Sequence, residues 1–306
     1  MKRINYFLIV LLIYSCNSTP FKDYEENLIY LNNLKGNVKT IISETFSAEE
    51  KFGEPIKGEI TNPDFDLSEY LNVLTPPNSK VEFSENGKLM LIEVNNSYLS
   101  YSLKHSYDKN WNRIEMSFKY NENETIHKFI NENNRIISGK TYNKEGEEIK
   151  TSKFNYVNGN LSEIISIDTE GTIIEKIKYI YENGTLAENT YGKTGDLVHY
   201  IKKDIYGRYI ETLFYENNKF IFKYNGQKPF PKEILSYSDN DLTGKMTISL
   251  DENDNIIETR LFDEDGEVET IHKYFYKYDK EGNWIERILY ENDNIENITI
   301  RTIEYY

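Results

Sequence analysis

The sequence predicts an all-β fold, namely an extended, curled antiparallel meander of tandem β-hairpin repeats. We expect about 16–18 strands, mostly in a single layer, and little helix. Three observations support this. Turn-forming residues recur at nearly constant spacing, large residues repeat two positions apart before these turns, and proline is absent from residues 78–228. Each is expected of consecutive strands in one antiparallel sheet.

Residues 1–15 are predicted to be a lipoprotein signal peptide. Lys2 and Arg3 form a positive start, and residues 7–13 are an unbroken apolar run that is too short to span a bilayer. The only cysteine, Cys16, follows directly, and this arrangement resembles a bacterial lipobox. The resemblance implies that Cys16 is lipidated (palmitate or a similar fatty acid) after the signal is removed. Several acyl chains on Cys16 would anchor the protein stably to a membrane.

Residues 16–36 are predicted to be the lipidated cysteine and a tether. Asn17, rather than Asp, follows the cysteine, which favours export to the outer membrane. The acidic cluster at 22–26 resembles surface-export signals of some Bacteroidetes lipoproteins, or it is a solvated linker. Localisation is therefore predicted as outer membrane, lipid-anchored, facing the periplasm or the cell surface.

Residues 37–78 are predicted to be a less regular N-terminal module, and residues 79–306 a hairpin-repeat domain. The module contains an expected strand at 38–46 and an expected short helix at 66–74, which the Pro76-Pro77 pair ends. Glycine or asparagine recurs every 11 to 13 residues in the middle of the repeat domain. These positions are Asn134, Gly146, Gly159, Gly171, Gly184, Gly195, Gly207 and Asn218. Both residue types tolerate the positive φ of tight turns, so two spacings make one hairpin of about 25 residues.

Large residues two positions apart predict one aromatic face, because such residues share a face of a strand. The clearest pairs are Phe154 and Tyr156, Tyr179 and Tyr181, Phe222 and Tyr224, and Tyr276 and Tyr278. Lysines such as Lys176 and Lys178 occupy the opposite face, which should be solvated. Pro229 and Pro231 interrupt the spacing and predict an irregular loop.

The repeats resemble YD-repeat (Rhs-like) sequences, most clearly at residues 276–287, which read Tyr-Lys-Tyr-Asp-Lys-Glu-Gly-Asn-Trp-Ile-Glu-Arg. Residues 34–39, 51–58 and 301–306 resemble the two ends of Bacteroidetes lipoproteins built from such repeats. Residues 181–184 also resemble YwqK-type antitoxin repeats. The resemblance implies tandem β-hairpins, often a cell-envelope location, and no catalytic residues.

Four aromatic residues are candidates for stacking on a ligand such as a sugar, namely Trp111, Trp284, Tyr276 and Tyr278. The alternative is that the two tryptophans sit in equivalent positions after turns and cap the core. The repeated carboxylates Glu163, Glu188, Glu211, Glu258 and Glu286 are predicted to be cross-strand partners of Lys or Arg, rather than a glycosidase pair.

No catalytic residue, metal site or cofactor is predicted. His105, His127, His199 and His272 lie far apart in the sequence without paired spacing, which is typical of sporadic strand residues. A single cysteine excludes a multi-cysteine zinc site. The acidic loop that starts at Asp251 has Ile256 and Phe262 where a calcium-binding EF-hand needs Gly and Glu.

The net charge is −15, and it becomes 34 − 51 = −17 when Lys2 and Arg3 are removed. Such a chain repels phosphate backbones, so nucleic acid is not expected as a partner. We predict a non-enzymatic envelope lipoprotein whose repeat sheet binds a glycan or a protein. The alternative is an immunity or antitoxin-like protein that neutralises a toxin. An enzyme is a third reading, which would need polar residues clustered in a pocket.

Overall fold

The computed structural model describes residues 33–61, 77–95, 100–214 and 218–306. The predicted signal peptide, Cys16, the tether up to residue 32 and the expected helix at 66–74 lie outside these residues. Within the described ranges no helix is long and apolar enough to cross a membrane. The described secondary structure consists of 21 strands in one sheet.

The strands follow one another along the chain with short connections. They are β1 (Val38–Lys51), β2 (Glu54–Ile60), β3 (Ser79–Phe83), β4 (Leu89–Asn95), β5 (Ser100–Tyr107), β6 (Arg113–Tyr120), β7 (Asn123–Glu132), β8 (Arg135–Asn143), β9 (Glu148–Val157), β10 (Asn160–Ile167), β11 (Ile173–Glu182), β12 (Thr185–Gly192), β13 (Leu197–Lys203), β14 (Tyr209–Leu213), β15 (Lys219–Lys223), β16 (Glu233–Ser238), β17 (Asp241–Leu250), β18 (Ile256–Phe262), β19 (Val268–Tyr278), β20 (Trp284–Glu291) and β21 (Asn294–Tyr305). All pairings are antiparallel, and from β3 onward each strand pairs with the next one.

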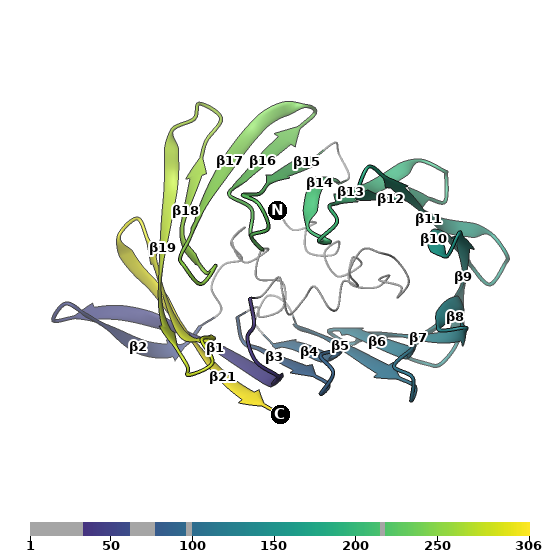
Figure 1. Cartoon of the computed structure of the whole chain (residues 1–306), viewed down its shortest axis with the longest axis horizontal. Coiled ribbons are helices and arrows are strands. Elements are labelled where there is room, and N and C mark those ends of the chain that lie inside the picture. The colour runs from purple at the N-terminus through teal and green to yellow at the C-terminus, as the bar shows by residue number, and fades with distance from the viewer. Residues whose placement is uncertain (1–32, 62–76, 96–99, 215–217) are drawn as a thin grey trace.

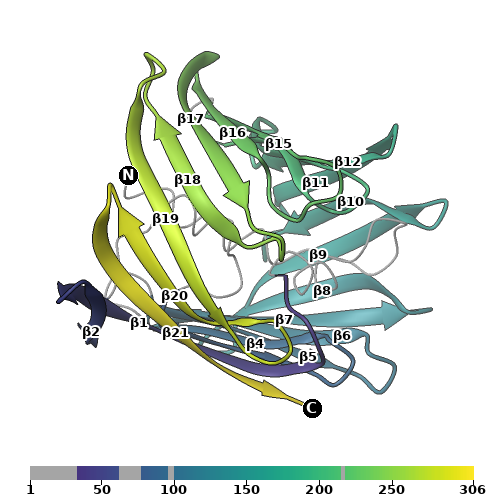
Figure 2. The same ribbon diagram turned by 60° about the vertical axis from the view of Figure 1, so that its left-hand side comes forward.

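The sheet closes on itself, so the predicted open, curled meander of 16–18 strands is wrong. β1 pairs with β21 on one side and with β3 on the other. Ile41 of β1 lies opposite both Ile303 and Val81. β1 therefore makes the seam of a closed 20-stranded antiparallel barrel, seen end-on in Figure 1 and from the side in Figure 2. Closure satisfies the two edges that an open meander would leave exposed.

The segment before β1 is fastened to turns near the end of the chain. The backbone N–H of Lys35 donates to Asn283 Oδ1 at 2.8 Å, and Asn283 Nδ2 donates to the Lys35 carbonyl at 2.7 Å. The Asn33 side chain donates to the Asn253 carbonyl. We call this the entry end of the barrel, because Val38 and Tyr305 also lie here. β1 then leads away from it.

The turns confirm the predicted spacing. Asn134 and the six glycines from Gly146 to Gly207 in that series all have positive φ. In most of the five-residue turns an aspartate opens the loop and a glycine takes the fourth position. Asp168 Oδ1, for example, accepts the backbone N–H groups of Glu170 at 3.0 Å and Thr172 at 2.8 Å. The predicted irregular loop at Pro229 and Pro231 is also confirmed, between β15 and β16.

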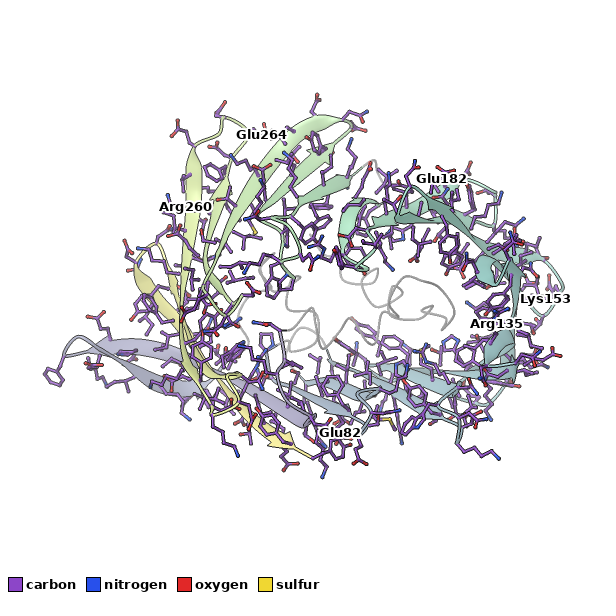
Figure 3. The ribbon with its side chains drawn as sticks, in the orientation of Figure 1. Glu82, Arg135, Lys153, Glu182, Arg260 and Glu264 are labelled. Atoms are coloured by element: carbon purple, nitrogen blue, oxygen red, sulfur yellow. The ribbon has the colours of Figure 1, made fainter. Side chains whose placement is uncertain are left out.

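Alternate residues of each strand face the outside and the inside of the ring. Lys153 and Glu182 point outward in Figure 3, so their neighbours Phe154 and Tyr181 belong to the inner face. The outer face carries ion pairs between neighbouring strands: Lys176–Glu163 at 3.4 Å, Lys140–Glu148 at 2.7 Å, Lys277–Glu286 at 2.6 Å and Lys223–Glu233 at 2.5 Å. The sheet thus has the predicted solvated face, and it is the outer one.

The inner face holds the hydrophobic core in three clusters. One lies on β1 and β3–β6, where Ile41 and Ile92 are completely buried. The second spans β8–β12 around Phe154 and Ile164. The third spans β16–β19 around Met246. Burying one such side chain is worth about 1.5–3 kcal/mol, so the inner face is where the fold gains its stability.

Candidate functional site on the inner face of the barrel

The structure brings three of the four predicted stacking residues together. Tyr276 and Tyr278 on β19 and Trp284 on β20 share the inner face, and Tyr278 lies directly opposite Trp284. Trp111 lies far along the ring, in the turn between β5 and β6. The predicted lipidation site Cys16 is outside the described residues.

Trp111 and Trp284 are not in equivalent positions, contrary to the alternative offered by the sequence. Trp111 has a φ of 62° and occupies the turn position that glycine fills elsewhere, as Gly282 does before Trp284. Its ring lies 6.0 Å from the ring of Tyr107. It is 41% exposed, whereas Trp284 is 8% exposed. Trp111 therefore belongs to the entry end and Trp284 to the core.

The tyrosine hydroxyls of the inner face act as struts between strands. Tyr276 donates to the Ile256 carbonyl at 2.7 Å, and Tyr278 donates to Asp251 Oδ2 at 2.7 Å. Two further tyrosines repeat the first bond, from Tyr107 to the Leu89 carbonyl and from Tyr156 to the Ile136 carbonyl, each at 2.9 Å. Burial raises the pKa of Tyr276 and of Tyr278, and the Asp251 carboxylate adds to the rise for Tyr278.

Two buried arginines, which the sequence analysis did not single out, complete this cluster. The Arg301 guanidinium lies 3.2 Å from the centre of the Trp284 ring. Arg287 lies 5.5 Å from the Trp284 ring and 5.7 Å from the Tyr274 ring. Its Nη2 donates to Thr299 Oγ1 at 3.4 Å. Burial, and secondly the charge of Arg287, lowers the pKa of Arg301.

This cluster is a stacked cation–π assembly that joins the last strands to the seam. Arg301 lies opposite Ser43 of β1, and Thr299 accepts or donates a 3.1 Å hydrogen bond with Thr45. One face of Trp284 is occupied by Arg301, so that face is used within the protein. Alternation from Trp284 would place Arg287, three residues later, on the other face, and a bulge in the β19–β20 pairing brings it opposite Tyr276 on the aromatic face.

All four histidines lie on the inner face and are buried. Three of them stand two residues before an aromatic residue: His105 before Tyr107, His127 before Phe129 and His272 before Tyr274. That repeated placement was the signal missed when they were treated as sporadic. The pKa of His105, His127 and His199 is lowered to about 4, chiefly by burial.

Histidine hydrogen bonds on this face run across strands. His127 Nδ1 lies 2.9 Å from Thr141 Oγ1, and His272 Nδ1 lies 3.3 Å from Thr259 Oγ1. His272 Nε2 also lies 3.1 Å from the Glu291 carboxylate. These contacts connect neighbouring strands, as the tyrosine struts do. Among the described residues, no group of three or more His, Cys, Asp or Glu side chains could hold a metal ion.

Three of the five repeated carboxylates pair across strands as predicted. Glu163 pairs with Lys176 and Glu286 with Lys277 across the outer face. Glu188 pairs with Lys203 at 2.6 Å on the inner face, where both side chains are mostly buried. Glu258 instead pairs with Arg260 of its own strand, at 2.7 Å. These carboxylates thus form ion pairs within the sheet, which is a structural role.

No known family model matches the chain, and no curated protein matches it. Among solved structures, a porin-like protein from Bacteroides uniformis is 11% identical, with a TM-score of 0.35 over 88% of this chain and 98% of that one. A porin-like protein from Bacteroides vulgatus is 9% identical, with a TM-score of 0.27 over 89% and 99%. The TcdB2–TccC3 structure with Cdc42 is 10% identical, with a TM-score of 0.24 over 84% of this chain and 19% of that one. Likeness at this level carries no function to the chain, and the YD-repeat resemblance stays a prediction.

Proposed function

We propose that this protein is a non-enzymatic barrel of the cell envelope, anchored by lipid on Cys16, that binds a protein partner through its water-exposed surface. The observation that carries the proposal is the polarity of the barrel wall. The outer face carries charges, such as the outward Lys153 and Glu182, between exposed apolar residues such as Phe275, whereas the core residues such as Phe154 are buried on the inner face.

The charges on this outer face distinguish it from the wall of a barrel that spans a bilayer. A transmembrane barrel presents an apolar band to lipid, and each Lys or Arg at its midplane costs about 2–4 kcal/mol. Here Lys176 pairs with Glu163 on the outer face near the middle of β11 and β10, and Lys277 pairs with Glu286 near the end of β19. The wall is therefore suited to water, and membrane attachment is left to the predicted lipid.

A protein partner is favoured over a glycan by how the aromatic rings are used. Sugar-binding platforms need exposed ring faces, whereas Trp284 is buried under Arg301 and the hydroxyls of Tyr276 and Tyr278 bond within the barrel. Trp111 alone of the four predicted residues is exposed. The polar groups of the inner face serve as struts and ion pairs, which supports a non-enzymatic role.

The anchoring is tested by placing a site-specific protease site in the tether, between Ser18 and Leu31. Cleavage in isolated envelopes should release the entire barrel into the soluble fraction. The matched control is Cys16→Ala, which should lose labelling by an alkyne fatty acid, because no other cysteine exists. A barrel that stays in the membrane after complete cleavage would contradict the proposal.

A further inference from the structure

The β1–β2 hairpin is the one described strand pair that leaves the ring. β1 pairs with β3 over Thr40–Ser43 and with β21 as far as Ser47, and beyond that its partner is β2. The hairpin projects past the barrel wall in Figure 1. The 14 residues of β1 carry its tip about 46 Å along the strand from the entry end, at about 3.3 Å per residue. We call residues 48–57 the finger.

The tip of the finger is built from a residue that suits the turn poorly. Phe52 and Gly53 have φ values of 57° and 82°, the left-handed values of a tight hairpin turn. Equivalent two-residue turns use Asn158-Gly159 and Asn183-Gly184. Asparagine tolerates this conformation, whereas a phenylalanine there is strained. The turn itself therefore gains nothing from an aromatic ring.

Phe52 also gains nothing from packing, because its exposed fraction is 105%. The other aromatic residue with positive φ is Trp111, which rests on Tyr107 and is 41% exposed. Trp111 thus has an internal contact that accounts for its ring. Neither the turn nor packing therefore accounts for an aromatic ring at the end of this projecting hairpin.

The charges around the ring indicate what that molecule carries. Residues 48–57 contain Glu49, Glu50 and Glu54 against Lys51 and Lys57. Lys57 lies 3.9 Å from the Phe46 ring and is directed back toward the barrel. Lys51 lies 3.7 Å from Glu49. Lys51 also lies opposite Glu54, so residues 48–57 carry an excess of 3 − 2 = one negative charge, and this excess is complementary to a basic surface.

Two other uses of the finger fit less well. Addition of a further strand along the free edge of β2 is disfavoured. Pro55 supplies no N–H donor, and the charged Lys57 and Glu59 of this edge strand oppose pairing with another chain. Insertion into the membrane that holds the predicted lipid is disfavoured by the carboxylates at the tip. It is also disfavoured because the tip lies away from the entry end, where the tether joins.

We propose that the finger docks Phe52 into an apolar pocket of a protein partner whose rim carries Lys or Arg side chains facing Glu50 and Glu54. This inference rests on the proposed function, because it names the part of the surface that binds and the chemistry of the partner. Buried aromatic anchors typically dominate such interfaces.

The first experiment places a photo-cross-linking phenylalanine analogue at position 52 of the full-length protein in intact cells, and at Ile130 as a control. Ile130 is also exposed, at 56%, but lies in a wall strand. We expect an adduct with another protein at 52 and not at 130. An adduct with lipid, an adduct with a second copy of this chain, or no adduct at 52 would overturn the proposal.

The second experiment measures the affinity of the cross-linked protein, once identified and purified, by titration calorimetry. Phe52→Asn should weaken binding by more than 30-fold, because removal of a hot-spot side chain typically has at least this effect. Glu50→Lys combined with Glu54→Lys should weaken it by at least about tenfold and reduce its salt dependence. Ile130→Asn should leave the affinity unchanged.

The Phe52→Asn variant separates an effect on binding from an effect on folding. Asparagine suits the turn, so the melting temperature of this variant should equal or exceed that of the parent protein. If the partner binds the Phe52→Asn variant as tightly as the parent protein, the proposed role of the finger is refuted, while the proposed binding function is not. Failure of the tether-cleavage test would instead count against the proposed function, whatever the finger does.

Discussion

Acidification should unfold this barrel, because it protonates histidines that are buried on the inner face. Burial lowers the pKa of His105, His127 and His199 to about 4. In the unfolded chain a histidine titrates near about 6.5. The unfolded chain therefore binds more protons between these values. The stability present above about pH 6.5 is lost progressively as the pH falls toward about 4.

The size of the effect follows from the pKa difference. A shift of about 2.5 pKa units is worth about 3.4 kcal/mol when complete, at 1.36 kcal/mol per unit. Between about pH 7.5 and pH 5, each histidine lowers the free energy of unfolding by about 2 kcal/mol. Three independent sites would together remove about 6 kcal/mol, which is comparable to the whole stability of many domains.

The assay is urea unfolding of the mature protein, followed by tryptophan fluorescence at the two pH values. His127→Gln keeps a polar partner for Thr141 and removes the titrating group. It should therefore reduce the pH-dependent loss by about 2 kcal/mol. The matched control is Thr141→Val, which removes the same hydrogen bond but should lower stability equally at both pH values. A His127→Gln variant with the parent's full pH dependence would refute the reasoning.

Three further outcomes test the ring and its inner cluster. Deleting residues 298–306 should open the seam with β1 and produce aggregates in size-exclusion chromatography, and a monomer that melts like the parent would contradict closure. Trp284→Ala should lower the free energy of unfolding in urea by about 3–5 kcal/mol, because it leaves a cavity at a buried site. Trp111→Gly should leave this free energy nearly unchanged, because the lost ring contact is offset by a turn without backbone strain. Tyr305→Phe removes a hydrogen bond to Asp279 and should cost about 0.5–1.5 kcal/mol, and an unchanged urea midpoint would show that this bond contributes nothing.

Local features of the fold could be predicted because they repeat within the reach of one hairpin. Positive φ at Gly159 and Gly184 follows from the turn spacing. The inner position of Phe154 follows from strand parity, and the pairing of Glu163 with Lys176 follows from their neighbouring strands. Each of these features involves residues fewer than about 25 apart, which is one hairpin repeat.

Closure could not be predicted, because it joins residues from opposite ends of the chain. Nothing in the sequence around Val38 or Tyr305 specifies that these residues lie opposite each other. The sequence predicts a strand at 38–46, but in a module separate from the repeats, and nothing local to that strand indicates that it pairs with both the first hairpin and the last strand. For the same reason the sequence does not predict that Phe52 lies on a projecting finger. The hairpin projects because β1 extends beyond the residues that pair with β3 at the seam.

The arginine cluster depends on local shifts in how neighbouring strands pair. Trp284 and Arg287 are three residues apart, so alternation would place them on opposite faces, and they share the inner face because the β19–β20 pairing is shifted by a bulge between Lys277 and Tyr278. The proximity of Arg287 to Arg301 depends on the register between β20 and β21, which a local bulge shifts between Leu289 and Tyr290. Alternation alone gives neither these bulges nor the register. The stacking of Arg301 on Trp284 could therefore not be predicted from the alternation of residues along the strands.

The seam at β1 also dictates the order in which the chain can fold as it is delivered to its compartment. Hairpins such as β11–β12 join residues close in sequence and can form as soon as they emerge. β1 emerges early, but its partner β21 is among the last segments of the chain to arrive. Until residues 294–305 are available, the edge of β1 that pairs with β21 stays unsatisfied. A partly folded chain would therefore expose this edge to strands of other molecules.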